Sequence, residues 1–308
     1  MTATAARWTD RLPTRVGRGV HTLAIASLIS QIGIIVTGGA VRLTESGLGC
    51  SEWPNCVPGS MTPTPEMGIH GLIEFGNRTL TFVLTAIAVA MIVSVWRMRR
   101  TEPVVFRLAV GLFGVIPAQA VIGGITVWTD LNPWVVSLHF LVSAVVVAVA
   151  VLLVNRTGMA RRGEDSVAVR PLARPVRALG WTVLATAAAA VVLGTVVTGT
   201  GPHAGDAASP RHPFDAEIVT RMHTAPVYLL VAATLVLLLL VARDARQRAL
   251  RRAVMLLLAV VLLQGAIGYW QHFTGLPVAL VLTHMLGSAL LVAAAANVWD
   301  RATGRFPL

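Results

Sequence analysis

The sequence predicts an all-α, polytopic membrane protein whose eight transmembrane helices form two tandem four-helix bundles. Three observations lead to this fold class. Of the 308 residues, 55% are hydrophobic and only 13% are charged, which is too apolar a composition for a soluble protein. Apolar runs of about 20 residues recur along the chain, and each is long enough to cross a hydrocarbon core of about 30 Å. The second half of the chain also repeats a pattern found in the first half.

The apolar runs give the positions of the expected helices. In chain order, these helices cover residues 20–41, 70–96, 104–127, 134–154, 176–199, 219–242, 253–270 and 277–298. No signal-peptide cleavage pattern precedes the first run, so we expect it to remain in the membrane as an anchor. The sequence therefore predicts a multi-pass protein that has the lipid bilayer as its surroundings.

A repeat relates the two halves of the chain. A Gln-x-x-Ile-Gly segment begins at Gln119 and again at Gln264, and a histidine follows each segment, at His139 and His284. Both residues of the second copy lie 145 positions after their mates. Because four crossings return the chain to its starting side, we expect the two bundles to be related by a parallel pseudo-two-fold repeat. Each copy places one imidazole among the apolar residues of a membrane helix.

A charged segment separates the two halves of the repeat. A second, shorter motif, Gly-x-x-Val-Thr-Gly, also occurs once in each half, at residues 33–38 and 194–199. Between its copies, residues 156–175 contain arginines, glycines and prolines and interrupt the apolar pattern. We therefore expect an N-terminal half at residues 1–155, a cytoplasmic linker in this segment, and a C-terminal half at residues 176–308.

The distribution of the basic residues predicts the topology. All 25 are arginine, and the formal net charge is +11. They gather at both termini and in every second loop, whereas the alternate loops contain only Arg42, Arg211 and Arg221. An arginine excess marks the cytoplasmic side, so we expect cytoplasmic N- and C-termini in a protein of the cell membrane. The positive charge therefore reflects topology and does not indicate a nucleic-acid partner.

Two cysteines, Cys50 and Cys56, lie in the first loop expected outside the cytoplasm. That compartment is oxidising, so the sequence predicts a disulfide that closes a short loop. A structural staple is the simplest interpretation of such a pair. A redox role and a metal site are the alternatives.

Glu74 is the one acidic residue expected inside the bundle, near the outer end of the second helix. His70 lies one turn before Glu74 and Arg78 lies one turn after it, so the three side chains share a helix face. One interpretation is a Glu74–Arg78 charge pair that anchors the end of the helix. The other is a catalytic carboxylate beside a cofactor, where it would transfer a proton or stabilise charge.

Three histidines, at positions 139, 223 and 284, lie a short way into helices and near the same face of the membrane. Two neutral imidazoles that face each other across an apolar bundle suit axial ligation of haem iron, and His223 and His284 form such a candidate pair. Zinc fits less well, because no cysteine or acidic residue accompanies them. In the first half, Asn77 stands where the repeat predicts the mate of His223, and His70 is the nearest substitute as a partner for His139.

A long motif covers the end of the first helix and the following loop. Residues 37–50 read Thr-Gly-Gly-Ala-Val-Arg-Leu-Thr-Glu-Ser-Gly-Leu-Gly-Cys, and Trp-Pro-x-Cys follows at residues 53–56. In this motif the chain resembles the haem A synthase family. The resemblance also includes the Ile-Glu-x-x-Asn-Arg segment at residues 73–78, the two Gln-x-x-Ile-Gly segments and the histidines near the helix starts. The similarity extends from about residue 20 to 300, and the motif in the first loop is specific.

The resemblance implies an enzyme of two four-helix halves that converts haem O to haem A for terminal oxidases. A ring methyl group would be oxidised to a formyl group by successive hydroxylations. The family also implies that His223 and His284 bind a haem b cofactor. The N-terminal half would take haem O, with His139 on the substrate iron and with Glu74 essential. A haem O synthase would supply the substrate, and an electron donor of unknown identity would be needed.

The chain departs from the family pattern at two places. Many members have Glu-x-x-His-Arg where this chain has Asn77 before Arg78, so a ligand at that position is not carried over. Some members have a second cysteine pair in the third outside loop, but residues 200–218 contain no cysteine here.

Because arginine suits carboxylate groups, Arg42, Arg78 and Arg221 are expected to bind haem propionates.

Two other classes of membrane protein share part of this pattern. A di-haem b-type electron carrier, reduced by quinol, would use the same membrane histidines. A transporter of haem or ions would explain the parallel repeat and the polar groups at membrane depth. The motif in the first loop and the carboxylate of Glu74 favour the enzyme over both alternatives.

Overall fold

The computed structural model describes residues 8–163, 172–242, 244 and 247–304. Within them the chain is all-helical, without a strand, and eight of its helices are long and apolar enough to cross a membrane. The predicted eight-helix, all-α membrane fold is therefore confirmed. The long helices are α1 (Arg18–Leu43), α2 (Gly68–Val95), α3 (Pro103–Trp128), α4 (Pro133–Arg162), α5 (Arg174–Thr200), α6 (Ala216–Val241), α7 (Arg248–Phe273) and α8 (Val278–Thr303).

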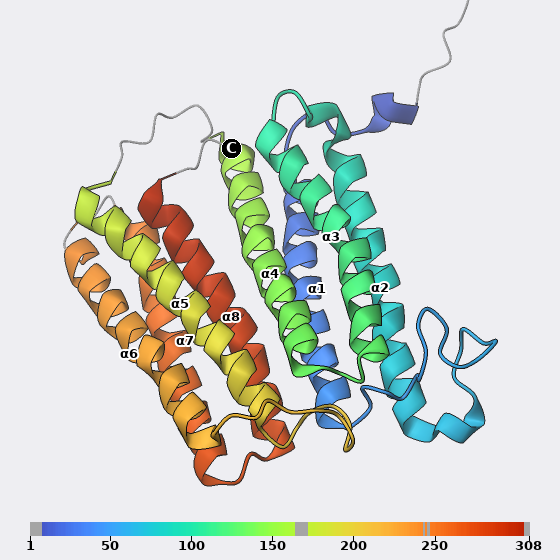
Figure 1. Cartoon of the computed structure of the whole chain (residues 1–308). Helices are drawn as coiled ribbons and strands as arrows, with labels where there is room; N and C mark the ends of the chain where they lie inside the picture. The colour runs from blue at the N-terminus through green and yellow to red at the C-terminus, as the bar shows by residue number, and fades with distance from the viewer. Residues whose placement is uncertain (1–7, 164–171, 243, 245–246, 305–308) are drawn as a thin grey trace, which may run out of the picture.

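The helices form two groups of four that pack side by side (Figure 1). One apolar core joins α1–α4 and another joins α5–α8. Between the groups, α8 packs on α4 and α1, and α5 packs on α4. A smaller cluster of Ile35, Val147 and Ala289 joins the two groups, and the division of the chain into two halves stays a prediction. Part of the linker expected between them, residues 164–171, lies outside the described residues.

The fourth helix extends to Arg162, beyond the end near residue 154 that the apolar pattern predicts. The added turns contain Arg156, whose guanidinium makes two hydrogen bonds, of 2.9 and 2.6 Å, to the carboxylate of Asp300 on α8. Both residues are buried, so the two partners satisfy each other's charge. The expectation that Glu74 is the only acidic residue inside the bundle was therefore wrong.

Capping residues set the start of two helices that carry candidate ligands. Asn132 accepts a hydrogen bond of 3.0 Å from the Trp134 N–H at the start of α4. Asp215 accepts one of 2.9 Å from the Ile218 N–H at the start of α6. These caps satisfy amide groups that the first helical turn leaves unpaired. They fix where α4 and α6 begin, and so the depth of the histidine that follows each cap.

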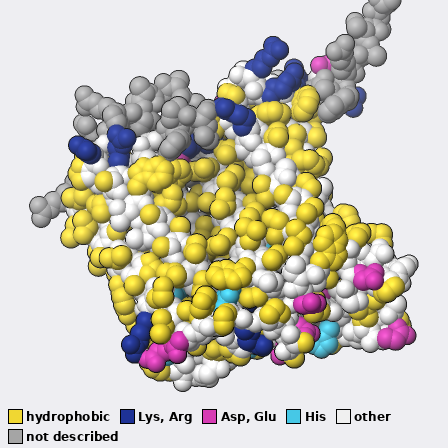
Figure 2. Space-filling model, viewed as in Figure 1, with side chains coloured by type: hydrophobic (Ala, Val, Ile, Leu, Met, Phe, Trp, Pro, Cys, Tyr) yellow, Lys and Arg dark blue, Asp and Glu magenta, His cyan; other side chains and the backbone are white. Residues whose placement is uncertain are grey.

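The surface has the polarity of a membrane protein (Figure 2). Hydrophobic side chains cover the middle of this face, most of its arginines lie at the upper end, and most of its acidic residues lie at the lower end beside some arginines. Large apolar side chains such as Phe82 and Leu239 are 74% exposed, which suits contact with lipid. The start of the described chain and the end of α8 both lie at the upper end (Figure 1).

Candidate functional site

The imidazole of His223, on α6, packs against a glycine of α5. A Cβ atom at Gly194 would lie 3.2 Å from the ring, so no larger residue fits there without a shift. The Nδ1 atom of His223 is 2.8 Å from the carbonyl oxygen of Ala190. Because a carbonyl oxygen only accepts, Nδ1 carries the hydrogen of the neutral ring and Nε2 keeps the lone pair that a metal requires. The hydrogen bond therefore fixes the orientation of the His223 ring and leaves Nε2 as the atom able to bind a metal.

His284, on α8, is held in a related way by α7. A Cβ atom at Gly268 would lie 3.3 Å from its ring, and Gln264 Nε2 donates to the carbonyl oxygen of His284 at 2.9 Å. The Nδ1 atom of His284 is buried without a hydrogen-bond partner in the described part of the chain. His284 and His223 are therefore each held by a glycine of the preceding helix, on two different helices of the same four-helix group.

His139, on α4, has surroundings like those of His284. A Cβ atom at Gly123 of α3 would lie 3.5 Å from its ring, and its Nδ1 atom is also buried without a partner among the described residues. Gln119 Nε2 donates to the carbonyl oxygen of His139 at 3.2 Å and to Ser143 Oγ at 2.6 Å. In both copies, the repeated glutamine and glycine thus hold the histidine. The pseudo-two-fold relation of the complete halves stays a prediction.

Asn77 and His70, the residues considered as partners of His139, have contacts of their own. Asn77 Oδ1 accepts a hydrogen bond of 2.7 Å from Thr37 Oγ1 of α1. His70 is exposed in the first turn of α2, and its Nδ1 atom is 2.9 Å from Ser46 Oγ. Haem ligation by either residue stays a prediction.

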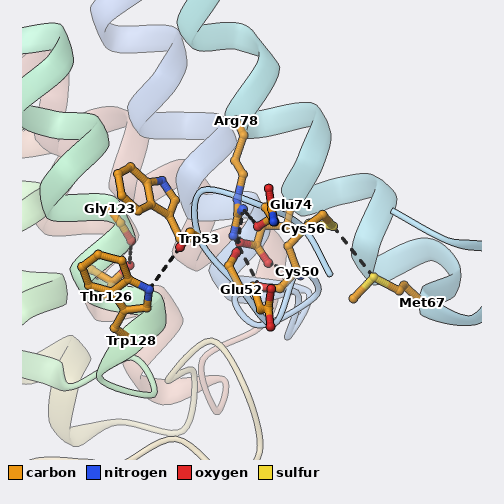
Figure 3. A network of polar contacts seen from close by, with 11 residues as sticks. Cys50, Glu52, Trp53, Cys56, Met67, Glu74, Arg78, Gly123, Thr126 and Trp128 are labelled. Atoms are coloured by element: carbon orange, nitrogen blue, oxygen red, sulfur yellow. Dashed lines mark hydrogen bonds and ion pairs between the residues drawn. A yellow bond between two sulfur atoms is a disulfide. The ribbon is translucent and has the colours of Figure 1, made fainter. Parts of the chain in front are cut away.

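Glu74 is buried beneath the loop that carries the cysteines (Figure 3). Its Oε2 atom accepts the Cys50 N–H at 2.6 Å, and its Oε1 atom accepts Arg78 Nε at 3.0 Å. Arg78 also donates to the carbonyl oxygens of Glu52 and Asn55, both at 3.0 Å. The charge pair is therefore present, and it fastens the loop to α2. These charge-assisted hydrogen bonds leave the carboxylate little freedom to rotate.

The predicted disulfide between Cys50 and Cys56 closes this loop. The loop also reaches α3, where a Cβ atom at Gly124 would lie only 2.4 Å from the indole of Trp53. Trp128 Nε1 donates to the Trp53 carbonyl oxygen at 3.2 Å, and the two indoles meet edge to face (Figure 3). The loop is therefore anchored to two helices of the half that contains His139.

Arg42 and Arg221, expected to bind propionates, both have partners within the protein. Arg42 donates to the carbonyl oxygens of His203 at 2.6 Å and Thr198 at 3.0 Å, and so joins α1 to the second half. Arg221 pairs with Glu217, one turn away on an exposed face of α6. Propionate binding by these arginines, and by Arg78, stays a prediction.

His212, placed by the sequence in an outside loop, is only 4% exposed. Its ring lies between Trp134 at 4.2 Å and Phe214 at 5.5 Å, and neither ring nitrogen has a hydrogen-bond partner among the described residues. Burial, and then the charge of Arg42, lower the pKa of His212 below its usual value. We therefore expect a neutral ring at pH 7. No pattern in the sequence indicated this burial, because Trp134 belongs to the other half.

The donor set of His223 and His284 fits haem. Both rings pack on glycines, and the hydrogen bond of His223 Nδ1 leaves Nε2 with the lone pair that a metal requires. Among the described residues, no cluster of three or more His, Cys, Asp or Glu side chains could hold a metal ion by itself. A porphyrin supplies the four equatorial donors that such a histidine pair lacks.

Comparison with known proteins agrees with the resemblance in the loop motif. The chain is 27% identical to the haem A synthase of Symbiobacterium thermophilum over 58% of this chain. It is 34% identical to that of Lysinibacillus sphaericus over 42% of this chain, and 24% identical to that of Rhizobium johnstonii over 91%. These alignments cover 59%, 42% and 89% of the respective relatives, so the chain spans only about half the length of the first two.

The sequence model of one family matches the chain over nearly its whole length. That match runs from residue 21 to residue 296 and therefore includes the loop motif, Glu74 and all three membrane histidines. It covers all or most of each of the eight spanning helices. This protein therefore belongs to the COX15-CtaA family of cytochrome oxidase assembly proteins.

Proposed function

We propose that this protein is a haem A synthase, a membrane oxidoreductase that oxidises a ring methyl group of haem O to a formyl group. The observation that carries the proposal is the asymmetry between its halves. One half has two membrane histidines, His223 and His284, each packed on a glycine, whereas the other has one such histidine, His139, and the buried, loop-covered Glu74. A resident cofactor and a reacting substrate require two such different sites. The names of the relatives support the same activity.

In this proposal, His223 and His284 would hold a haem b through their imidazole nitrogens. The hydrogen bond from His223 Nδ1 to Ala190 fixes the orientation of the first ring, and the contact with Gly268 fixes the second. When bound, the haem supplies the electron transfer that amino-acid side chains cannot perform.

His139 and Glu74 would act on the substrate in the N-terminal half. His139 would bind the substrate iron, held at the right depth by Gln119. Glu74 would hold a negative charge, or exchange a proton at its carboxylate oxygens, beside the ring carbon that is oxidised. Arg78 and the disulfide loop position this carboxylate and cover it from water.

The reaction would replace two C–H bonds of the methyl group by C–OH bonds in succession. The resulting geminal diol then loses water to give the aldehyde. An electron-transfer partner and an oxygen source outside this chain balance the oxidation. A haem O synthase in the same membrane would supply the substrate, and the arginine-rich ends and loops would lie in the cytoplasm.

Haem extraction tests the proposal. Cells that produce this protein together with a haem O synthase should accumulate haem A, identified in acid-extracted haem by chromatography. Cells with Glu74→Gln should retain haem O. Glu217→Gln is a matched control, because it removes the carboxylate of an exposed Glu–Arg pair with the same spacing. Unchanged haem O in cells with the native protein would favour an electron carrier instead.

A further inference from the structure

The same glycine motif is used differently in the two halves. In α5, the imidazole of His223 covers Gly194, at 3.2 Å from the position of a Cβ atom. The first copy of the motif places Gly33 at the corresponding position of α1. No atom of another described element lies within 4 Å of a Cβ atom built there. The N-terminal half therefore keeps the glycine but has no side chain against it.

Asn77, at the position that corresponds to His223, does not fill this space. Thr37 lies one turn from Gly33 on the same face of α1, and its Oγ1 atom donates to Asn77 Oδ1 at 2.7 Å. Thr37 Oγ1 also lies 3.3 Å from the carbonyl oxygen of Ile34 in its own helix, and the equivalent Thr198 of α5 donates within its own helix, to Gly194 at 2.8 Å. Thr37 thus draws the Asn77 amide one turn along α1, away from Gly33. The Asn77 oxygen is engaged, and an amide nitrogen has no lone pair to give to a metal.

His70 is also unsuited to fill the space. Its ring is exposed in the first turn of α2, two turns from Asn77, and it is engaged by Ser46 at 2.9 Å. His139, in contrast, has the same glycine and glutamine contacts as His284. The N-terminal half therefore retains one of the two imidazole positions and leaves the other open.

We propose that the N-terminal half binds its haem through His139 alone and keeps the opposite coordination position open to a small neutral ligand. This inference rests on the function proposed above. The ligand would occupy the space beside Gly33. The polarity and access of such a distal space decide whether a haem iron binds small ligands or only transfers electrons. The C-terminal half, with both imidazoles in place, would only transfer electrons.

Free imidazole is a direct probe, because it has the shape of the side chain that is missing. Purified full-length protein loaded with haem O should show a low-spin signal from the His223–His284 haem and a high-spin signal from the second haem. Added imidazole should convert the high-spin signal to low-spin, with saturation at one site per chain. Electron paramagnetic resonance and optical difference spectra measure both species.

Two variants locate the imidazole site. Asn77→His should be low-spin without added imidazole and should not respond to it. Gly33→Val should stay high-spin and lose the response, because its methyl groups occupy the space. Gly111→Val is the matched control, since Gly111 is an exposed helical glycine with no neighbouring element within 4 Å. The low-spin signal of the C-terminal half reports correct folding in each variant.

The outcomes separate this inference from the proposed function. Two low-spin haems per chain in the native protein would overturn the inference, as would a low-spin N-terminal haem that becomes high-spin in His70→Ala. If the native protein has a high-spin haem that does not respond to imidazole, the inference would also be overturned. A protein that takes up only one haem and forms no haem A would overturn the proposed function itself.

Discussion

The substitution Glu74→Gln gives the sharpest test of the candidate site, because it separates a catalytic role from a structural one. Glutamine keeps nearly the same volume and one carbonyl oxygen, so it can still accept either the Cys50 N–H or an Arg78 N–H. It loses the negative charge and one acceptor. Catalysis and loop anchoring therefore predict different results.

The structural effect of the change is bounded by the contacts of Arg78. A charged hydrogen bond contributes about 1.5–3 kcal/mol, and an unpaired buried charge destabilises by more. Arg78 is 23% exposed, however, and it keeps the carbonyl oxygens of Glu52 and Asn55 as acceptors. We therefore expect a loss of about 1–3 kcal/mol in the free energy of unfolding. Such a loss lowers the yield of folded protein but leaves its specific activity unchanged.

The catalytic effect should be larger and of a different kind. Loss of a positioned acid–base group lowers rates by about 10²–10⁴-fold, or about 3–5 kcal/mol in the barrier. The assay is haem A formed per molecule that carries the resident haem, counted from its low-spin signal. Glu217→Gln, in the exposed pair on α6, should retain full activity. Native turnover by haem-loaded Glu74→Gln would remove Glu74 from the mechanism and leave it as a loop anchor.

Four further predictions concern other parts of the molecule. His223→Ala should abolish the low-spin spectrum of the resident haem, and a normal spectrum would refute the ligand assignment. Asp300→Asn should lower the free energy of unfolding by about 3–5 kcal/mol, because it leaves Arg156 charged and buried; a thermal or denaturant transition equal to the native one would contradict this. Gly124→Leu should displace Trp53 from α3 and reduce haem A formation while the resident haem stays bound, whereas native turnover would show that the contact is dispensable. A cysteine at Ala160 should resist impermeant thiol reagents in intact cells, and labelling from outside would reverse the topology.

The sequence alone predicted the number of helices, because an apolar run of sufficient length has few alternatives to a membrane helix. It also predicted the disulfide, since only two cysteines exist and they lie close together. Helix ends were less accurate. The end of α4 was predicted too early because its last turns contain Arg156, and an arginine after an apolar run indicates a cytoplasmic loop. Arg156 is buried between helices because its guanidinium pairs with Asp300 of α8, and this contact is visible only in the tertiary structure.

The repeated pattern identified His139 and His284 as candidates, because a spacing preserved between two copies is visible in one dimension. His223 was identified by its position near the start of a predicted helix, and Glu74 as the acidic residue of the second apolar run. The contacts of each residue depend on the neighbouring helices, and hydropathy does not predict which helices are neighbours. Only the tertiary structure shows that Glu74 binds the cysteine loop and that the indole of Trp53 packs against Gly124. It also decided that Thr37 holds Asn77 away from Gly33. These contacts join residues of different helices, so they follow from packing geometry rather than from the periodicity of any single segment.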